Sequence, residues 1–127
     1  MVFFMKYTSM HVPFRKLRIW QKARELVKEV YLLSHMLPSG EKYGLVSQIQ
    51  RAAVSVPSNI AEGSRRKSGK DFAHFLDIAS GSLAELETQI ILGVDVGYFS
   101  EVRCQNVLDR IDEIQKMLYM FEKHLTK

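Results

Sequence analysis

The sequence predicts an all-α protein with an antiparallel up-down-up-down four-helix bundle. Four long segments repeat their apolar residues at steps of three and four, which is the period of an amphipathic helix. Short segments containing proline, glycine or serine separate them, and no segment alternates polar and apolar residues over a useful length, as a strand would. Because short connections make consecutive helices antiparallel neighbours, the bundle is expected to run up, down, up and down.

The chain of 127 residues is long enough for one domain with a substantial core. We expect residues 1–13 to form an N-terminal arm, to which the sequence assigns no structure, and residues 14–127 to form a single bundle domain. Hydrophobic residues make up 46% and charged residues 25%, as in soluble globular proteins. No apolar run approaches the ~20 residues of a membrane span. The lone Cys104 fits a reducing compartment, so we expect a cytoplasmic protein that does not bind membranes.

The first helix is expected from Phe14 to Leu37, between the helix-breaking Pro13 and Pro38. Its apolar stripe comprises Ile19, Trp20, Ala23, Leu26, Val27, Val30, Leu33, Ser34 and Leu37. The opposite face is polar, and the first half of that face is almost purely basic. Its cations include Arg15, Lys16, Arg18 and Lys22.

The second helix is expected from about Lys42 to Arg66, after a turn at residues 38–41. It contains Pro57, which has no backbone donor and crowds the carbonyl four residues earlier, that of Ala53. A helix that keeps such a proline is expected to be packed on several sides. A polar row on this helix consists of Arg51, Ser55, Asn59 and Glu62.

Asn59 and Glu62 lie just beyond the proline and allow two interpretations. They could bind a partner or a ligand. Alternatively, they could satisfy polar groups that Pro57 leaves free, or set the helix register between subunits. We favour the structural role, because buried polar groups need partners and can specify geometry.

The third helix is expected to begin after Ser68 and to run to about Gly93. Ser68 is a plausible N-cap, with Asp71 three residues later in a short-armed relative of the capping box. Gly81 lies in the middle of this helix, where glycine costs about 1 kcal/mol relative to alanine. We therefore expect another part of the protein to pass close to Gly81.

The fourth helix is expected from its cap at Ser100 to about His124. Beyond the four apolar stripes, the second and third helices carry apolar surface on more than one side. Such surface suits an interface between subunits, although a broad internal face within one subunit would also account for it. The residues concerned are Val54, Ser55, Phe75, Ile78, Val94 and Tyr98.

A family resemblance is carried by the run from Arg51 to Gly63, RAAVSVPSNIAEG. It resembles the signature of the bacterial four-helix-bundle proteins named for open reading frames in 23S ribosomal RNA intervening sequences, also called the S23 family. LRIWQKARELVKEVY is similar to the family's first helix, and FAHFLDIASGSLAELETQIILGVDVGYF is similar to its third. The resemblance covers about residues 14–125. The positions matching its central motif include Arg51, Pro57, Asn59, Glu62 and Gly63.

This resemblance implies an up-down bundle that assembles as a homo-oligomer, a pentameric ring in members of known structure. The chain is also similar to the accessory protein of diversity-generating retroelements, a basic pentamer that associates with a reverse transcriptase and nucleic acid. No catalytic residues are established for the family. The resemblance therefore assigns no catalytic role to any residue of this chain.

The residues themselves give little sign of catalysis or of a cofactor. A di-iron bundle needs a Glu-x-x-His motif on each of two helices, and the chain has none. Asp71, His74 and Asp77 share a helical face and could bind a metal, but a solvated, salt-bridged face is the better interpretation. No glycine loop for phosphates and no arginine four to six residues before a histidine is present. We expect a non-enzyme without metal or cofactor.

The basic residues are the strongest functional signal. The formal net charge is +4, and one cluster lies at the junction between the second and third helices. In an up-down bundle this junction shares an end with the start of the first helix, so two groups of cations are expected to meet there. The first group is Arg65, Arg66, Lys67 and Lys70, and the second is Arg15, Lys16, Arg18 and Lys22.

Three hypotheses follow from these features. The first is a non-enzymatic oligomeric binding module that associates with RNA or another nucleic acid, or with a nucleic-acid enzyme, through its basic end. A ring would repeat this end and strengthen its field. The second is a structural or protein-interaction scaffold without a nucleic-acid role, whose basic end is a solvated rim. The third is a metal protein or enzyme that uses Asp71, His74 and Asp77.

Overall fold

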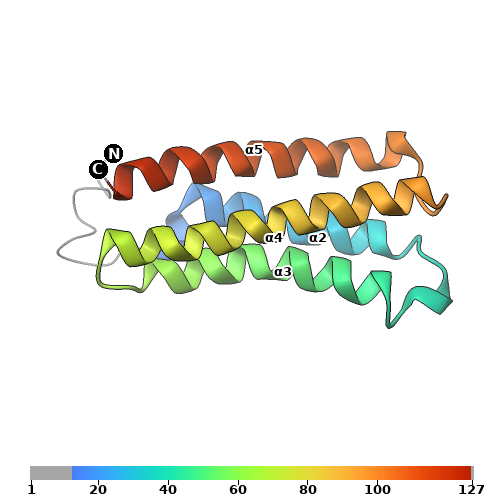
Figure 1. Cartoon of the computed structure of the whole chain (residues 1–127), viewed down its shortest axis with the longest axis horizontal. Coiled ribbons are helices and arrows are strands. Elements are labelled where there is room, and N and C mark those ends of the chain that lie inside the picture. The colour runs from blue at the N-terminus through green and yellow to red at the C-terminus, as the bar shows by residue number, and fades with distance from the viewer. Residues whose placement is uncertain (1–12, 127) are drawn as a thin grey trace.

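The structure, a computed structural model, describes residues 13–126 and confirms the all-α four-helix bundle. The bundle consists of α2 (Arg18–Ser34), α3 (Leu45–Ser64), α4 (Gly69–Asp95) and α5 (Glu101–Leu125). Each helix packs against the next along the chain, and α5 closes the bundle against α2 (Figure 1). The described residues contain no strand. Residues 1–12 of the predicted N-terminal arm lie outside the described residues.

The first helix is shorter than the sequence predicts. Phe14–Lys16 forms a single 3-10 turn, η1, and α2 begins only at Arg18. The break is at Leu17, whose backbone is extended (φ −77°, ψ 127°) and whose side chain is 1% exposed. Burying Leu17 in the core thus separates the two pieces. At its other end α2 stops at Ser34, three residues before the predicted end.

The second helix is also shorter at both ends than predicted, since α3 begins at Leu45 and ends at Ser64. The predicted turn before it contains a separate 3-10 turn, η2 (Ser39–Glu41), and residues 42–44 continue as a turn. Glu41 takes the place of a helix cap. Its Oε1 accepts a hydrogen bond from the backbone N–H of Leu45 at 3.1 Å. Its Oε2 accepts one from the hydroxyl of Tyr98 at 2.7 Å, which joins the α2–α3 connection to the α4–α5 connection. This hydrogen bond lowers the pKa of Glu41 and raises that of Tyr98.

The two predicted serine caps are confirmed. Ser68 Oγ accepts a hydrogen bond from the backbone N–H of Asp71 at 3.1 Å, and α4 begins at the next residue, Gly69. Ser100 Oγ accepts one from the backbone N–H of Arg103 at 3.2 Å at the start of α5. The first backbone N–H groups of a helix have no acceptor within the helix. Each serine accepts a hydrogen bond from one of them, which fixes where the helix begins.

The core is formed by the inward stripes of all four helices. Pro57 lies inside α3, as expected, and α3 is held between α2 and α4. Asn59 does not reach the carbonyl of Ala53, the group that Pro57 leaves without its helical donor. Its Nδ2 donates instead to the carbonyl and the hydroxyl oxygens of Ser55, at 2.8 and 2.9 Å. Asn59 therefore bridges one turn of α3, and it does not satisfy the carbonyl at the proline, which was one of the structural roles expected for it.

The predicted close approach at Gly81 is wrong. No heavy atom lies within 4 Å of the position that a Cβ would occupy there, and Gly81 is exposed. The close approach occurs at Gly63, where a Cβ would lie 2.7 Å from Phe75 Cβ and 2.9 Å from Phe72 Cδ1. Gly63 therefore allows the end of α3 to contact the start of α4. No packing explanation for Gly81 is found among the described residues.

Candidate nucleic-acid interface

The two predicted groups of cations lie at the same end of the bundle. Both η1 and the α3–α4 connection are at the left in Figure 1, where α5 also ends. The guanidinium carbon of Arg65 lies 5.9 Å from the ring centroid of Phe14, which ties η1 to this connection. We call this region the cationic end, and its seven exposed residues are Arg15, Lys16, Arg18, Arg65, Arg66, Lys67 and Lys70.

Two of the seven cations have partners within the protein. Arg66 pairs with Glu62 at 2.8 Å and lies over the ring of Phe75, 4.6 Å from its centroid. Arg65 lies over Phe14, as described above. The remaining five make no ion pair with any residue in the range 13–126 and are free to contact a polyanion. They are Arg15, Lys16, Arg18, Lys67 and Lys70.

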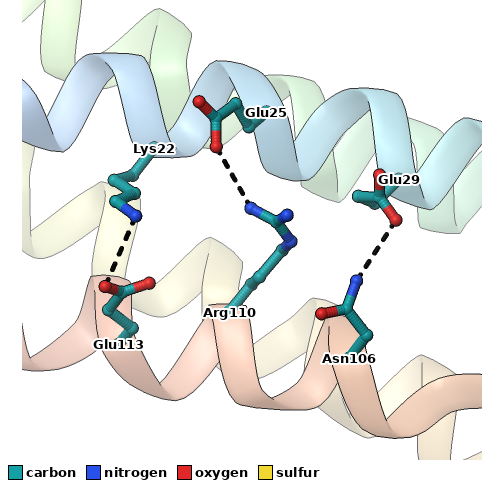
Figure 2. Close-up of polar contacts among 6 residues, drawn as sticks. All are labelled: Lys22, Glu25, Glu29, Asn106, Arg110 and Glu113. Carbon is teal, nitrogen blue, oxygen red and sulfur yellow. Dashed lines mark hydrogen bonds and ion pairs between the residues drawn. The ribbon is translucent and has the colours of Figure 1, made fainter.

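Lys22 does not belong to the exposed cluster. It is half-buried, and its Nζ lies 3.5 Å from Glu113 Oε2 on α5. This pair is one of three polar contacts along the seam between α2 and α5 (Figure 2). The others are Arg110 with Glu25 at 3.1 Å and Asn106 with Glu29 at 3.3 Å. Sequence analysis did not predict this seam, although opposite charges flank the two apolar stripes.

The end of α5 lies directly against the α3–α4 connection. A Cβ at Gly69 would lie 2.5 Å from the backbone carbonyl oxygen of Leu125. Glycine is therefore needed at the first residue of α4 for a steric reason. The contact places the C-terminal turn of α5 beside the cationic end (Figure 1).

The metal-binding alternative for Asp71, His74 and Asp77 on α4 finds no support. Within the described range, no group of three or more His, Cys, Asp or Glu side chains could hold a metal ion. Asp77 interacts instead with Glu122 of α5, and His74 packs its ring 5.6 Å from that of Phe75. The pKa of Glu122 is raised to about 7. Burial is the largest cause, and the hydrogen bond to Asp77 and the repulsion between the two carboxyl groups add to it. This carboxyl pair was not predicted from the sequence.

Two hollows lie on the surface on either side of Arg51. The larger, of about 760 Å³, lies between α2 and α3, and the smaller, of about 450 Å³, lies between α3 and α4. Ser55 is fixed at the edge of both hollows, since its Oγ accepts a hydrogen bond from Ser82 Oγ at 2.8 Å. The side chain of Arg51 is exposed and makes no hydrogen bond or ion pair with another described residue.

Part of the apolar surface predicted on the second and third helices faces solvent. Of the predicted residues, Val54 on α3 and Ile78 on α4 are each 40% exposed. Leu92 on α4, which was not among the predicted residues, is 50% exposed. The other predicted members of this surface are half-buried: Ser55, Phe75, Val94 and Tyr98. Ile78 and Leu92 are four helical turns apart on one side of α4, outside the core, and the exposed Glu85 lies between them on that side.

The fold and these surfaces define a class of protein: a small all-α bundle with a cationic end and a partly apolar flank. The family model described as 23S rRNA-intervening sequence protein matches residues 15–120, and the chain belongs to this family. The bundle is also similar to a crystal structure from Bacteroides thetaiotaomicron, described as a protein with unknown function from the S23 ribosomal protein family. The TM-score is 0.76 at 25% sequence identity, over 83% of this chain and 98% of the other. No curated protein matches the chain.

The structure bears on two further expectations. None of the described helices combines the length and the apolar character that crossing a membrane requires. Cys104 is a buried free thiol on α5, and burial raises its pKa. A buried thiol held in its neutral form is a poor nucleophile.

Proposed function

We propose that the protein is a non-enzymatic, oligomeric, cytoplasmic module that binds RNA or another nucleic acid through its cationic end. The observation that carries this proposal is the gathering of five exposed, unpaired cations from η1, α2, the α3–α4 connection and the start of α4. Side chains of this kind bind phosphates without reading sequence, and the affinity comes from the release of counterions. The family description refers to 23S rRNA, which makes RNA the first nucleic acid to test.

The affinity of such an interface should depend steeply on salt. If all five cations contact phosphates of a single strand, the logarithm of the association constant falls with the logarithm of salt concentration with a slope of about −3.5. Fluorescence anisotropy with a labelled single-stranded RNA would measure this slope. A slope near zero would contradict the proposal.

Charge reversal tests the same residues directly. The double variant Lys67→Glu with Lys70→Glu should weaken RNA binding by at least about tenfold, because it removes two phosphate contacts and introduces repulsion. The matched control is Lys28→Glu with Lys116→Glu, which changes the net charge equally but away from the five cations. Equal losses in the two variants would show that net charge, rather than the cationic end, determines binding.

We propose that copies of the chain associate through the apolar flank of α4, with five copies by analogy with the family. Exposed Ile78 and Leu92 support this proposal, since a subunit interface would remove them from water. Analytical ultracentrifugation should give a species larger than the monomer, and Ile78→Glu should shift it towards the monomer. Leu32→Glu is the control, because Leu32 is 64% exposed on α2, outside this flank. A monomeric wild-type protein would rule out the oligomer.

The second candidate is a protein-interaction scaffold without a nucleic-acid role, which the same apolar flank favours. The two candidates differ in one measurement. A scaffold should retain its oligomeric state and show no saturable RNA binding even at low salt. The binding module should show both self-association and salt-dependent RNA binding.

A further inference from the structure

The larger hollow beside Arg51 has the size and the side chains of a small-molecule site. Its volume of about 760 Å³ falls within the range of about 300–1,000 Å³ typical of ligand pockets. It is open to solvent and is formed by α2, the turn before α3, and the first half of α3. The residues that matter for its chemistry are Tyr31, Lys42, Tyr43, Ser47 and Arg51.

The charge of this hollow has one sign. Among the described residues that line it, Lys42 and Arg51 are the only charged ones, and none is a carboxylate. Neither cation makes an ion pair within residues 13–126. Glu85 lines the smaller hollow on the other side of Arg51, yet it forms no ion pair with that arginine. The larger hollow therefore offers two unneutralised cations, and a guanidinium is well matched to phosphate oxygens.

The remaining side chains add hydrogen-bond donors and an aromatic surface. The hydroxyls of Tyr31 and Ser47 make no hydrogen bond to another described residue, so both can donate to an anion. Tyr43 is 89% exposed, and the ammonium of Lys42 lies 5.4 Å from its ring centroid. An exposed tyrosine ring beside two cations provides a surface on which a nucleobase can stack while its phosphate contacts the cations.

One wall of the hollow is held by hydrogen bonds. Gln50 Nε2 on α3 donates to Ser34 Oγ on α2 at 3.0 Å, and Ser34 Oγ donates to the carbonyl of Tyr31 at 2.8 Å. These bonds fix the spacing of α2 and α3 beneath the hollow. A site with a fixed wall loses less entropy when it binds a ligand.

We propose that this hollow binds a nucleoside monophosphate, with the phosphate between Arg51 and Lys42 and the base against the ring of Tyr43. The inference goes beyond the proposed nucleic-acid interface and does not depend on it. Arg51 and Arg65 are fourteen residues apart along α3, which corresponds to about 21 Å. The hollow is therefore separate from the cationic end.

Isothermal titration calorimetry with adenosine 5′-monophosphate tests the proposal, and adenosine and inorganic phosphate serve as comparison ligands. The monophosphate should bind saturably and at least about tenfold more tightly than either fragment, because only it engages both the cations and the ring. Arg51→Ala should weaken its binding by at least about tenfold, and Tyr43→Ala should reduce its advantage over phosphate. Lys28→Ala, which removes an exposed cation elsewhere on α2, should leave the affinity unchanged.

Three results would overturn the proposal. They are the absence of saturable binding of the monophosphate, equal affinity for the monophosphate and inorganic phosphate, and wild-type affinity in a folded Arg51→Ala variant. Circular dichroism of each variant establishes that it is folded. Arg51 and Tyr43 are exposed side chains, so their truncation should not unfold the bundle.

Discussion

Replacing Gly63 and Gly81 by alanine should change the stability of the bundle in opposite directions. Both glycines lie inside helices, where alanine is preferred to glycine by about 1 kcal/mol. At Gly81 the new methyl group would meet no heavy atom within 4 Å, so the helix preference acts alone. We expect Gly81→Ala to raise the free energy of unfolding by about 1 kcal/mol.

At Gly63 the same gain is opposed by a clash. The methyl carbon would lie 2.7 Å from Phe75 Cβ, an atom fixed to the backbone of α4, so the conflict cannot be relieved by rotating a side chain. Overpacking of this kind costs about 1–3 kcal/mol. With a central value of about 2 kcal/mol, the net effect of Gly63→Ala is a loss of about 1 kcal/mol.

Thermal unfolding followed by circular dichroism would measure both variants. A change of 1 kcal/mol corresponds to about 4 °C in a domain of this size, so the two midpoints should differ by about 8 °C. The proteins must be compared at equal concentration, because self-association makes the midpoint depend on concentration. If Gly63→Ala were as stable as Gly81→Ala, the close approach of α3 and α4 would not constrain this position.

Three further predictions concern a cap, a buried amide and a carboxyl pair. Ser68→Ala should lower the free energy of unfolding by about 1 kcal/mol in urea denaturation, because the backbone N–H of Asp71 loses its acceptor. Gln89→Leu should raise it by about 1 kcal/mol, since Gln89 is 6% exposed and its Oε1 has no partner among the described residues. Folding raises the pKa of Glu122 from 4.5 to about 7. The contribution of this carboxyl to the free energy of unfolding is therefore fully present below pH 4.5, and it is lost as the pH rises through about 7. The thermal midpoint should therefore fall over this range in wild type, and the fall should be smaller in Glu122→Gln; an identical pH profile in the two proteins would contradict the assignment.

The fold was predictable because helical periodicity and capping are local properties of the sequence. Ser68 and Ser100 each precede an amphipathic segment, and both cap helices where expected. The break at Leu17 was not predictable in this way. It arises because the Leu17 side chain enters the core, which depends on the other helices rather than on neighbours in the sequence.

The site was predictable only in part. Up-down topology alone brings the two basic segments to one end, so their placement followed from the fold. Which cations remain free depends on contacts between helices, such as the pairing of Lys22 with Glu113. The role of Gly63 as opposed to Gly81 likewise depends on which helix lies opposite, and periodicity cannot distinguish the two.

The close contact between Leu125 and Gly69 has a practical consequence for experiments on this protein. Any tag or reporter fused after α5 emerges next to the α3–α4 connection. An acidic epitope there would compete with phosphates, and a polyhistidine tag would imitate extra basic residues. A small environment-sensitive dye attached at that point, by contrast, would test directly whether a polyanion binds there.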